Sequence, residues 1–145
     1  MRRGKGSRVS AIFSILLSGW MCPGIAADAF QPDATGLVVM EAEHFQGNVA
    51  GSDGHAWASA TGLAAGYSGV GAMQALPEDR SVWDVGYAGG ASRLDYAIEF
   101  ATAGTYYVWV RGYGPNTASD SVHVGLDGVA PATGFNFNGF VIKAW

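Results

Sequence analysis

Apolar and polar residues alternate along three stretches of the chain. In the clearest stretch, residues 93–100, every second residue is apolar, and Leu94, Tyr96, Ile98 and Phe100 share one face. A second alternation covers 106–111, a third covers 121–126, and weaker apolar runs lie at 37–44 and 70–76. A period of two is typical of half-buried antiparallel strands, and no long helical period follows residue 30. The pattern predicts an all-β fold.

The first two alternating stretches predict a hairpin. A three-residue loop at 102–104 ends at Gly104, which adopts the left-handed conformation that such a loop requires. In this register the paired core residues are Phe100 and Tyr106, Ile98 and Val108, and Tyr96 and Val110. On the outer face Asp95 lies opposite Arg111, a favourable cross-strand pair. A two-residue loop would turn Tyr107 and Trp109 toward the core instead, so we favour the three-residue loop.

The first 29 residues predict a secretory signal peptide. Four basic residues fall within the first eight, an apolar stretch of about 13 residues follows, and Ala27-Asp28-Ala29 matches an A-x-A cleavage site. A rival site ends at Ala27, and a buried N-terminal helix is the alternative structure. The apolar stretch is shorter than the roughly 20 residues that span a bilayer. We therefore expect an exported protein, periplasmic or extracellular, with a leader at 1–29 and one domain at 30–145.

Charge and composition exclude several classes of protein. With 49% hydrophobic and 12% aromatic residues, the chain is not intrinsically disordered. Removal of the leader takes four of the eight basic residues and one of the twelve acidic ones, so the net charge moves from −4 to −7. Four scattered cations do not follow a phosphate backbone, so nucleic acid and anionic lipid are poor partners. An acidic domain suits a neutral ligand or a cation such as calcium.

The predicted hairpin brings two long connections, 77–91 and 112–120, to the same end of the sheet. Loops on a rigid scaffold often carry function. We predict a ligand-binding surface at this end, formed by Trp83, Tyr87, Tyr113, Asn116 and Asp120. The alternative for Trp83 and Tyr87 is that they close the end of the core. Outer-face Tyr107 and Trp109 are a competing platform, although packing beneath a neighbouring segment is the favoured interpretation of that pair.

Catalytic motifs are missing from the sequence. It contains no G-x-S-x-G, H-E-x-x-H or G-x-G-x-x-G pattern. Asp53-Gly54-His55 has the composition of a turn, and His123 is expected to be solvated on an outer strand face. Adjacent Glu78 and Asp79 would not oppose each other across a glycosidic bond, as hydrolysis requires. The sequence therefore predicts a protein that is not an enzyme.

Four motifs occur in order: VMEAEHF at 39–45, GYSGVG at 66–71, LDYAIEF at 94–100 and GTYYVWVR at 104–111. With them the chain resembles the carbohydrate-binding modules of families 6 and 35, including the related module at the C-terminus of family 115 glycoside hydrolases. The likeness covers roughly residues 37–145. It implies a galactose-binding-like antiparallel β-sandwich (a jelly roll) that binds a polysaccharide without catalysis. It also implies that Glu41 and Glu43 bind a structural calcium ion and that Trp145 is a second sugar platform.

The residues themselves leave alternatives open. Glu41 and Glu43 would share one face of a strand, where calcium would relieve their repulsion, but without the resemblance a solvated outer face is the favoured interpretation. Modules of these families continue for one or two strands beyond the point where this sequence stops. We therefore expect a sandwich without its last strand or two, as in a fragment of a larger secreted glycoside hydrolase or surface protein. The alternative function is a structural or adhesion β-sandwich without a sugar site; intrinsic hydrolase activity ranks third.

Overall fold

The structure is a computed structural model that describes residues 12–15, 29–62, 65–100, 102–131 and 136–145. The strands are β1 (Ile12–Ile15), β2 (Gly47–Val49), β3 (Ala56–Ser59), β4 (Met73–Leu76), β5 (Arg93–Tyr96), β6 (Ser121–His123) and β7 (Asn136–Asn138). Two short helices accompany them, the 3₁₀ helix η1 (Ala42–His44) and α1 (Tyr87–Gly90). The predicted all-β class is confirmed. In the described part of the chain, no helix is long and apolar enough to cross a membrane.

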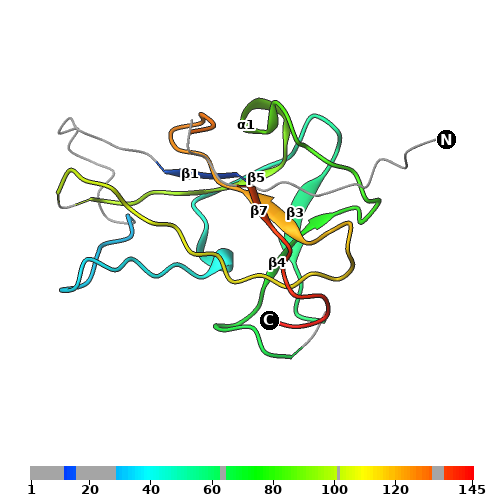
Figure 1. Ribbon diagram of the computed structural model, residues 1–145, viewed down its shortest axis with the longest axis horizontal. Helices are drawn as coiled ribbons and strands as arrows, with labels where there is room; N and C mark the ends of the chain where they lie inside the picture. Colours follow the sequence, from blue (N-terminus) through cyan, green and yellow to red (C-terminus); the bar gives the residue numbers. More distant parts are fainter. Residues whose placement is uncertain (1–11, 16–28, 63–64, 101, 132–135) are drawn as a thin grey trace.

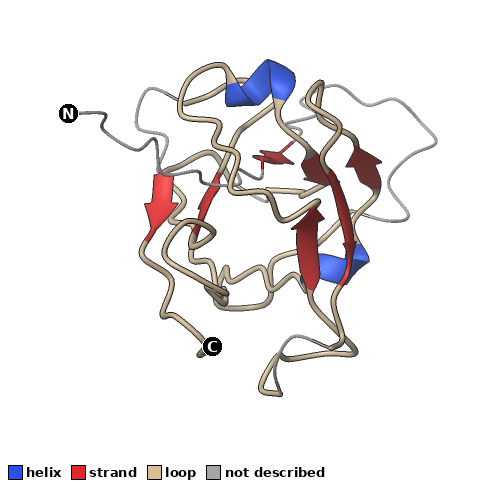
Figure 2. Ribbon diagram, turned by 90° about the vertical axis from the view of Figure 1, so that its right-hand side faces the viewer, coloured by secondary structure: helices blue, strands red, loops and turns tan. Residues whose placement is uncertain are grey.

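The strands form three small sheets. One has the order β1-β5-β2, and the pairs β3-β4 and β6-β7 form the other two (Figure 1). β5 runs parallel to β1 and antiparallel to β2, and the two remaining pairs are antiparallel. Figure 2 shows the two helices at opposite ends of the molecule. The strands thus surround a common interior that the loops complete.

The core is centred on β5 and the residues that follow it. Leu94, Tyr96 and Ile98 are 2%, 1% and 6% exposed, which confirms the face predicted from their alternation. The Tyr96 hydroxyl donates a hydrogen bond to the Ala42 carbonyl at 2.7 Å. Burial, together with the nearby charges of Glu43 and Asp95, raises the pKa of Tyr96 above its usual range. This phenol is therefore a neutral donor that attaches η1 to β5.

The predicted hairpin is wrong in its strand pairing. Residues 105–111 form no strand, and the strands that pair with β5 are β1 and β2. Asp95 accepts hydrogen bonds from Arg93 instead of Arg111. The turn does bring the ring of Tyr106 to 4.2 Å from that of Phe100, as the register requires. Tyr107 and Trp109 are 83% and 90% exposed, so the expectation that they pack beneath a neighbouring segment is also wrong.

Two further strand predictions need correction. In β6, Ser121 and His123 are buried while Val122 is only half-buried, so His123 is not a solvated outer residue. Its ring stacks on that of Tyr87 in α1 at 4.2 Å, which shields the face that we expected to meet solvent. Residues 37–44 contain η1 and no strand. The run at 70–76 is confirmed in part by β4.

Most of the predicted leader lies outside the described residues. Within 1–29, the structure describes 12–15, which form β1, and Ala29. The signal peptide therefore stays a prediction.

Candidate functional site

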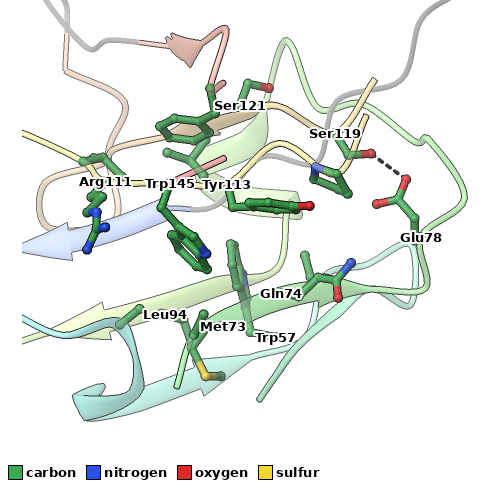
Figure 3. Close-up of a pocket in the computed structure, with 18 residues that line it drawn as sticks. Trp57, Met73, Gln74, Glu78, Leu94, Arg111, Tyr113, Ser119, Ser121 and Trp145 are labelled. Carbon is green, nitrogen blue, oxygen red and sulfur yellow. Dashed lines mark hydrogen bonds between the residues drawn. The ribbon is translucent and has the colours of Figure 1, made fainter. Parts of the chain in front are cut away.

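A cavity of about 140 Å³ lies between β3, β4 and the segments that flank β6 (Figure 3). Its lining includes Trp57, Met73, Gln74, Glu78, Leu94, Arg111, Tyr113, Ser119, Ser121, Phe140 and Trp145. Trp57 comes from β3, and Gln74 comes from the adjacent strand β4. The rigid β3-β4 pair thus supplies one wall, and 110–122 with the C-terminal residues supplies the other.

Trp145 is held in the cavity wall from several sides. The ring centroids of Tyr113 and Tyr67 lie 5.5 and 6.0 Å from that of Trp145. The guanidinium carbon of Arg111 lies 5.9 Å from the Trp145 ring centroid, in cation–π geometry. Arg111 also donates a hydrogen bond of 2.7 Å to the Gly66 carbonyl. The final residue of the chain is therefore an ordered aromatic surface.

The rim of the cavity is polar. Glu78 accepts hydrogen bonds from the Ser119 hydroxyl at 2.5 Å, drawn in Figure 3, and from the Asn116 amide at 3.4 Å. These bonds join the start of the 77–91 connection to the 112–120 connection. The prediction that the two connections meet is thereby confirmed.

Two buried polar atoms of the cavity lining have no hydrogen-bond partner among the described residues. They are the hydroxyl oxygen of Ser121, a residue that is 6% exposed, and the indole nitrogen of Trp57. An unsatisfied buried polar group costs about 1–3 kcal/mol, and such a group in a native protein requires an explanation.

The structure brings part of the sequence-predicted site together. Tyr113 and Trp145 line the cavity, and Asn116 adjoins it through Glu78. Asp120 adjoins the cavity lining. Its carbonyl oxygen accepts a hydrogen bond from the backbone amide of the lining residue Phe140, with an N···O distance of 3.0 Å.

Trp83 and Tyr87 lie elsewhere. Neither lines the cavity; Trp83 packs against a small core cluster formed by Tyr87 and Ala91. Tyr87 is 9% exposed and covered by His123. This arrangement matches the alternative that each residue closes the end of the core.

Sequence reasoning did not assign the lining residues Gln74 and Ser121; Trp57 and Tyr67, whose positions no strand register fixes, are only secondary candidates for the predicted surface. Residues 56–59 read Ala-Trp-Ala-Ser, and such a run does not predict which face of a strand is buried. The alternation at 121–126 has Val122 and Val124 on its apolar face, which predicts Ser121 on the outer one. Only the pairing of β3 with β4 and the packing around β6 bring these side chains to one cavity.

A second cluster surrounds the buried His55. Its Nδ1 and Nε2 atoms lie 3.1 Å from carboxylate oxygens of Asp53 and Asp79 respectively, and Asp53 also accepts a 2.6 Å hydrogen bond from the Trp83 indole. Partial burial acts to raise the pKa of Asp53, but hydrogen bonds from Trp83 and His55 outweigh it and lower that pKa. Hydrogen bonds from Ser81 lower the pKa of Asp79. The cluster joins the turn at 51–55 to the loop at 77–81.

Glu41 and Glu43 both reach the loop at 66–71. Glu41 accepts a hydrogen bond from the Ser68 hydroxyl at 3.0 Å, and Glu43 accepts one from the Val70 amide at 3.1 Å. The second carboxylate oxygen of Glu43 is buried without a hydrogen-bond partner in the described structure. Hard oxygen donors and an unsatisfied carboxylate oxygen fit calcium. The described residues hold no cluster of three or more His, Cys, Asp or Glu side chains suited to a metal, so backbone carbonyls or water would complete the coordination.

Comparisons with known proteins agree with this β-rich, ancillary character. Residues 32–135 match the family model of the glycosyl hydrolase family 115 C-terminal domain. The chain is also similar to uncharacterized protein P23 of Formosa agariphila, with 26% identity over 165 residues, and covers 92% of its own length but 39% of that relative. No solved structure matches it significantly. Because the family model matches well over half of the chain, this protein belongs to the glycosyl hydrolase family 115 C-terminal domain family.

Proposed function

We propose that this chain is a noncatalytic carbohydrate-binding domain that serves a glycoside hydrolase or surface protein, in the manner of carbohydrate-binding modules of families 6 and 35. Membership in a C-terminal domain family of glycosyl hydrolases supports an ancillary role. The observation that carries the proposal is the aromatic cavity with its polar rim.

The chemistry of the cavity suits a sugar ring. A sugar presents an apolar C–H face and a rim of hydroxyl groups. Trp145, Tyr113 and Trp57 offer flat apolar surfaces for that face. Gln74 offers an amide and Glu78 a carboxylate for the hydroxyl groups. Such a combination of apolar walls with a few convergent polar groups is typical of ligand sites.

We also propose that Glu41 and Glu43 hold a structural calcium ion. The ion would connect η1 to the loop at 66–71, which contains Gly66, the neighbour of Trp145. Calcium would therefore stabilise the fold close to the aromatic platform without contacting the sugar. The proposed site of action is outside the cytoplasm, in accordance with the predicted leader.

Calorimetric or NMR titration with xylan, galactan and uronate-containing oligosaccharides tests the proposed binding. We expect Trp145→Ala to weaken binding at least tenfold at a temperature where the variant remains folded. Trp109→Ala is the matched control, because Trp109 is 90% exposed and does not line the cavity. Trp83→Ala distinguishes the two candidate surfaces.

Loss of binding in Trp83→Ala with full binding in Trp145→Ala would move the site to the 77–91 connection. If the folded wild-type protein bound none of the glycans, the alternative of a structural or adhesion domain would replace this proposal.

A further inference from the structure

The described lining of the cavity carries two charged side chains, Glu78 and Arg111. Figure 3 shows them at opposite ends of the cavity, with Trp145 and Trp57 between them. The other described lining residues are apolar or are polar without a charge. A charged ligand would therefore meet two groups of opposite sign, and the group that is better placed to reach it determines the preference of the site.

Arg111 is part of the cavity wall. Its guanidinium carbon lies 5.9 Å from the centroid of the Trp145 ring, and one guanidinium nitrogen donates a hydrogen bond of 2.7 Å to the Gly66 carbonyl. Figure 3 shows this side chain on the far side of Trp145 from Gln74 and Glu78. The indole ring thus lies between the cation and the polar rim of the cavity.

Glu78 is held at the rim with one oxygen available. Its Oε1 atom accepts hydrogen bonds from the Ser119 hydroxyl at 2.5 Å and from the Asn116 amide at 3.4 Å. No hydrogen bond from the described residues reaches its Oε2 atom, and the residue is exposed. Two neighbouring side chains therefore fix the carboxylate in place, while its second oxygen can accept a hydrogen bond from a ligand.

The neighbouring acid, Asp79, faces another part of the molecule. Its Oδ1 atom lies 3.1 Å from Nε2 of His55 and accepts a hydrogen bond of 2.8 Å from the Ser81 amide. Asp79 does not line the cavity. Glu78 is therefore the lining side chain that gives the rim its negative charge.

We propose that Glu78 determines specificity, so that the cavity prefers neutral sugars to uronic acids. Its free oxygen accepts a hydrogen bond from a sugar hydroxyl, and a charged acceptor makes a stronger hydrogen bond than a neutral one. A uronate brings a second carboxylate to the same rim, where like charges repel and disfavour the wrong ligand. This inference rests on the proposed function and names the substrate class of the same site.

Titration of the full chain with matched pairs of ligands tests this specificity. One pair is a xylotriose that carries a glucuronate, together with its carboxyl-reduced form. The other is galactotriose together with its form oxidised to the uronate at C6. We expect the wild type to bind the neutral member of a pair about tenfold more tightly than the uronate. The preference should decline as the salt concentration rises from about 0.01 to 1 M, because the screening length falls from about 30 to 3 Å.

Glu78→Gln removes the charge but keeps an oxygen that can accept the hydrogen bond of Ser119. We expect this variant to bind the neutral ligand about threefold more weakly and the uronate about threefold more tightly, so that the preference disappears. Glu99→Gln is the matched control, because Glu99 is an exposed carboxylate that accepts a hydrogen bond from Gln31 and does not line the cavity. It removes the same charge and should keep the wild-type preference.

The possible outcomes separate this inference from the proposed function. Equal weakening of both members of a pair by Glu78→Gln would overturn the inference and leave Glu78 as a structural connection between two loops. Equal or tighter binding of the uronate by the wild type would also overturn it, with the proposed function intact. If the folded wild type bound neither member of either pair, the proposed function would fail and this inference with it.

Discussion

The position of Trp145 depends on a single glycine. Gly66 has a φ of +118°, and a Cβ atom added there would lie 3.0 Å from Cδ1 of the Trp145 ring. An alanine would therefore be strained in its backbone and would also press against the indole. The close approach of this loop to the ring is part of what shapes the cavity.

We expect Gly66→Ala to destabilise the protein by about 1 kcal/mol or more and to weaken glycan binding. Gly36→Ala is the matched control, because Gly36 also has a positive φ, of +85°, but its Cβ would meet no atom within 4 Å. Denaturant unfolding and glycan titration of both variants separate backbone strain from displacement of Trp145. Equal losses of affinity in the two variants would contradict the role of the contact.

The carboxylate of Asp53 predicts a pH dependence. Its pKa lies below its usual range in the folded protein, so the folded state favours the charged form. This contribution to stability is fully present above the unfolded-state pKa of about 4 and is lost as the pH falls through the lower folded-state value. We expect the melting temperature of the wild type to fall below about pH 4 more steeply than that of Asp53→Asn. Parallel profiles from pH 6 to 3 would contradict this account.

Among the elements, α1 has a specific packing role. Tyr87 at its first residue is buried and stacks on His123 of β6 with an interplanar angle of 11°. The short helix thereby covers the end of the β6-β7 pair. Its stability comes from this packing, because four residues are too few for an independent helix.

Tyr87→Ala should lower the free energy of unfolding by about 3 kcal/mol, as is usual when a buried aromatic ring is removed. Tyr107→Ala is the control, since Tyr107 is 83% exposed and its removal should change stability by less than about 0.5 kcal/mol. Chemical denaturation of both variants checks the difference. Similar losses in the two would show that α1 does not cover the core in this way.

The proposed calcium ion would connect two elements, because its proposed ligands join η1 to the loop at 66–71. If the proposed site binds calcium in the folded state, calcium should raise the melting temperature of chelator-treated protein. Glu43→Gln should abolish that increase. His44→Gln is a neighbouring control in the same helix, and His44 is exposed on it. An unchanged melting temperature of the wild type with calcium would remove the metal proposal without affecting the sugar proposal.

For the molecule as a whole, the size of the cavity limits the ligand. About 140 Å³ is below the 300–1,000 Å³ of pockets that enclose drug-sized molecules. We therefore expect one sugar ring to be enclosed and the affinity to lie between about 10 µM and 1 mM. Titration with di-, tri- and tetrasaccharides of one glycan should give dissociation constants within about threefold of one another. A steep gain with length would indicate a groove that extends beyond the cavity.

The sequence by itself determined which residues share a face. The period of two at 94–98 placed Leu94, Tyr96 and Ile98 together in the core, and the alternation of 106–109 survives in their exposures although no strand forms there. The meeting of the loops at Glu78 and Ser119 was also predicted. The shared faces follow from local backbone geometry, which assigns alternate residues to opposite sides whatever the partner strand. The meeting of the loops was predicted from a hairpin that does not form in the structure.

Only the tertiary structure decided which segment occupies each edge of β5 and which face of β6 is buried. The edges of β5 are taken by β1 and β2, and β1 and β2 are distant from β5 in sequence. The burial of His123 depends on α1 lying over it, and the place of Trp57 in the cavity depends on the pairing of β3 with β4. Periodicity indicates that the two faces of a strand differ, but long-range packing determines which face becomes interior.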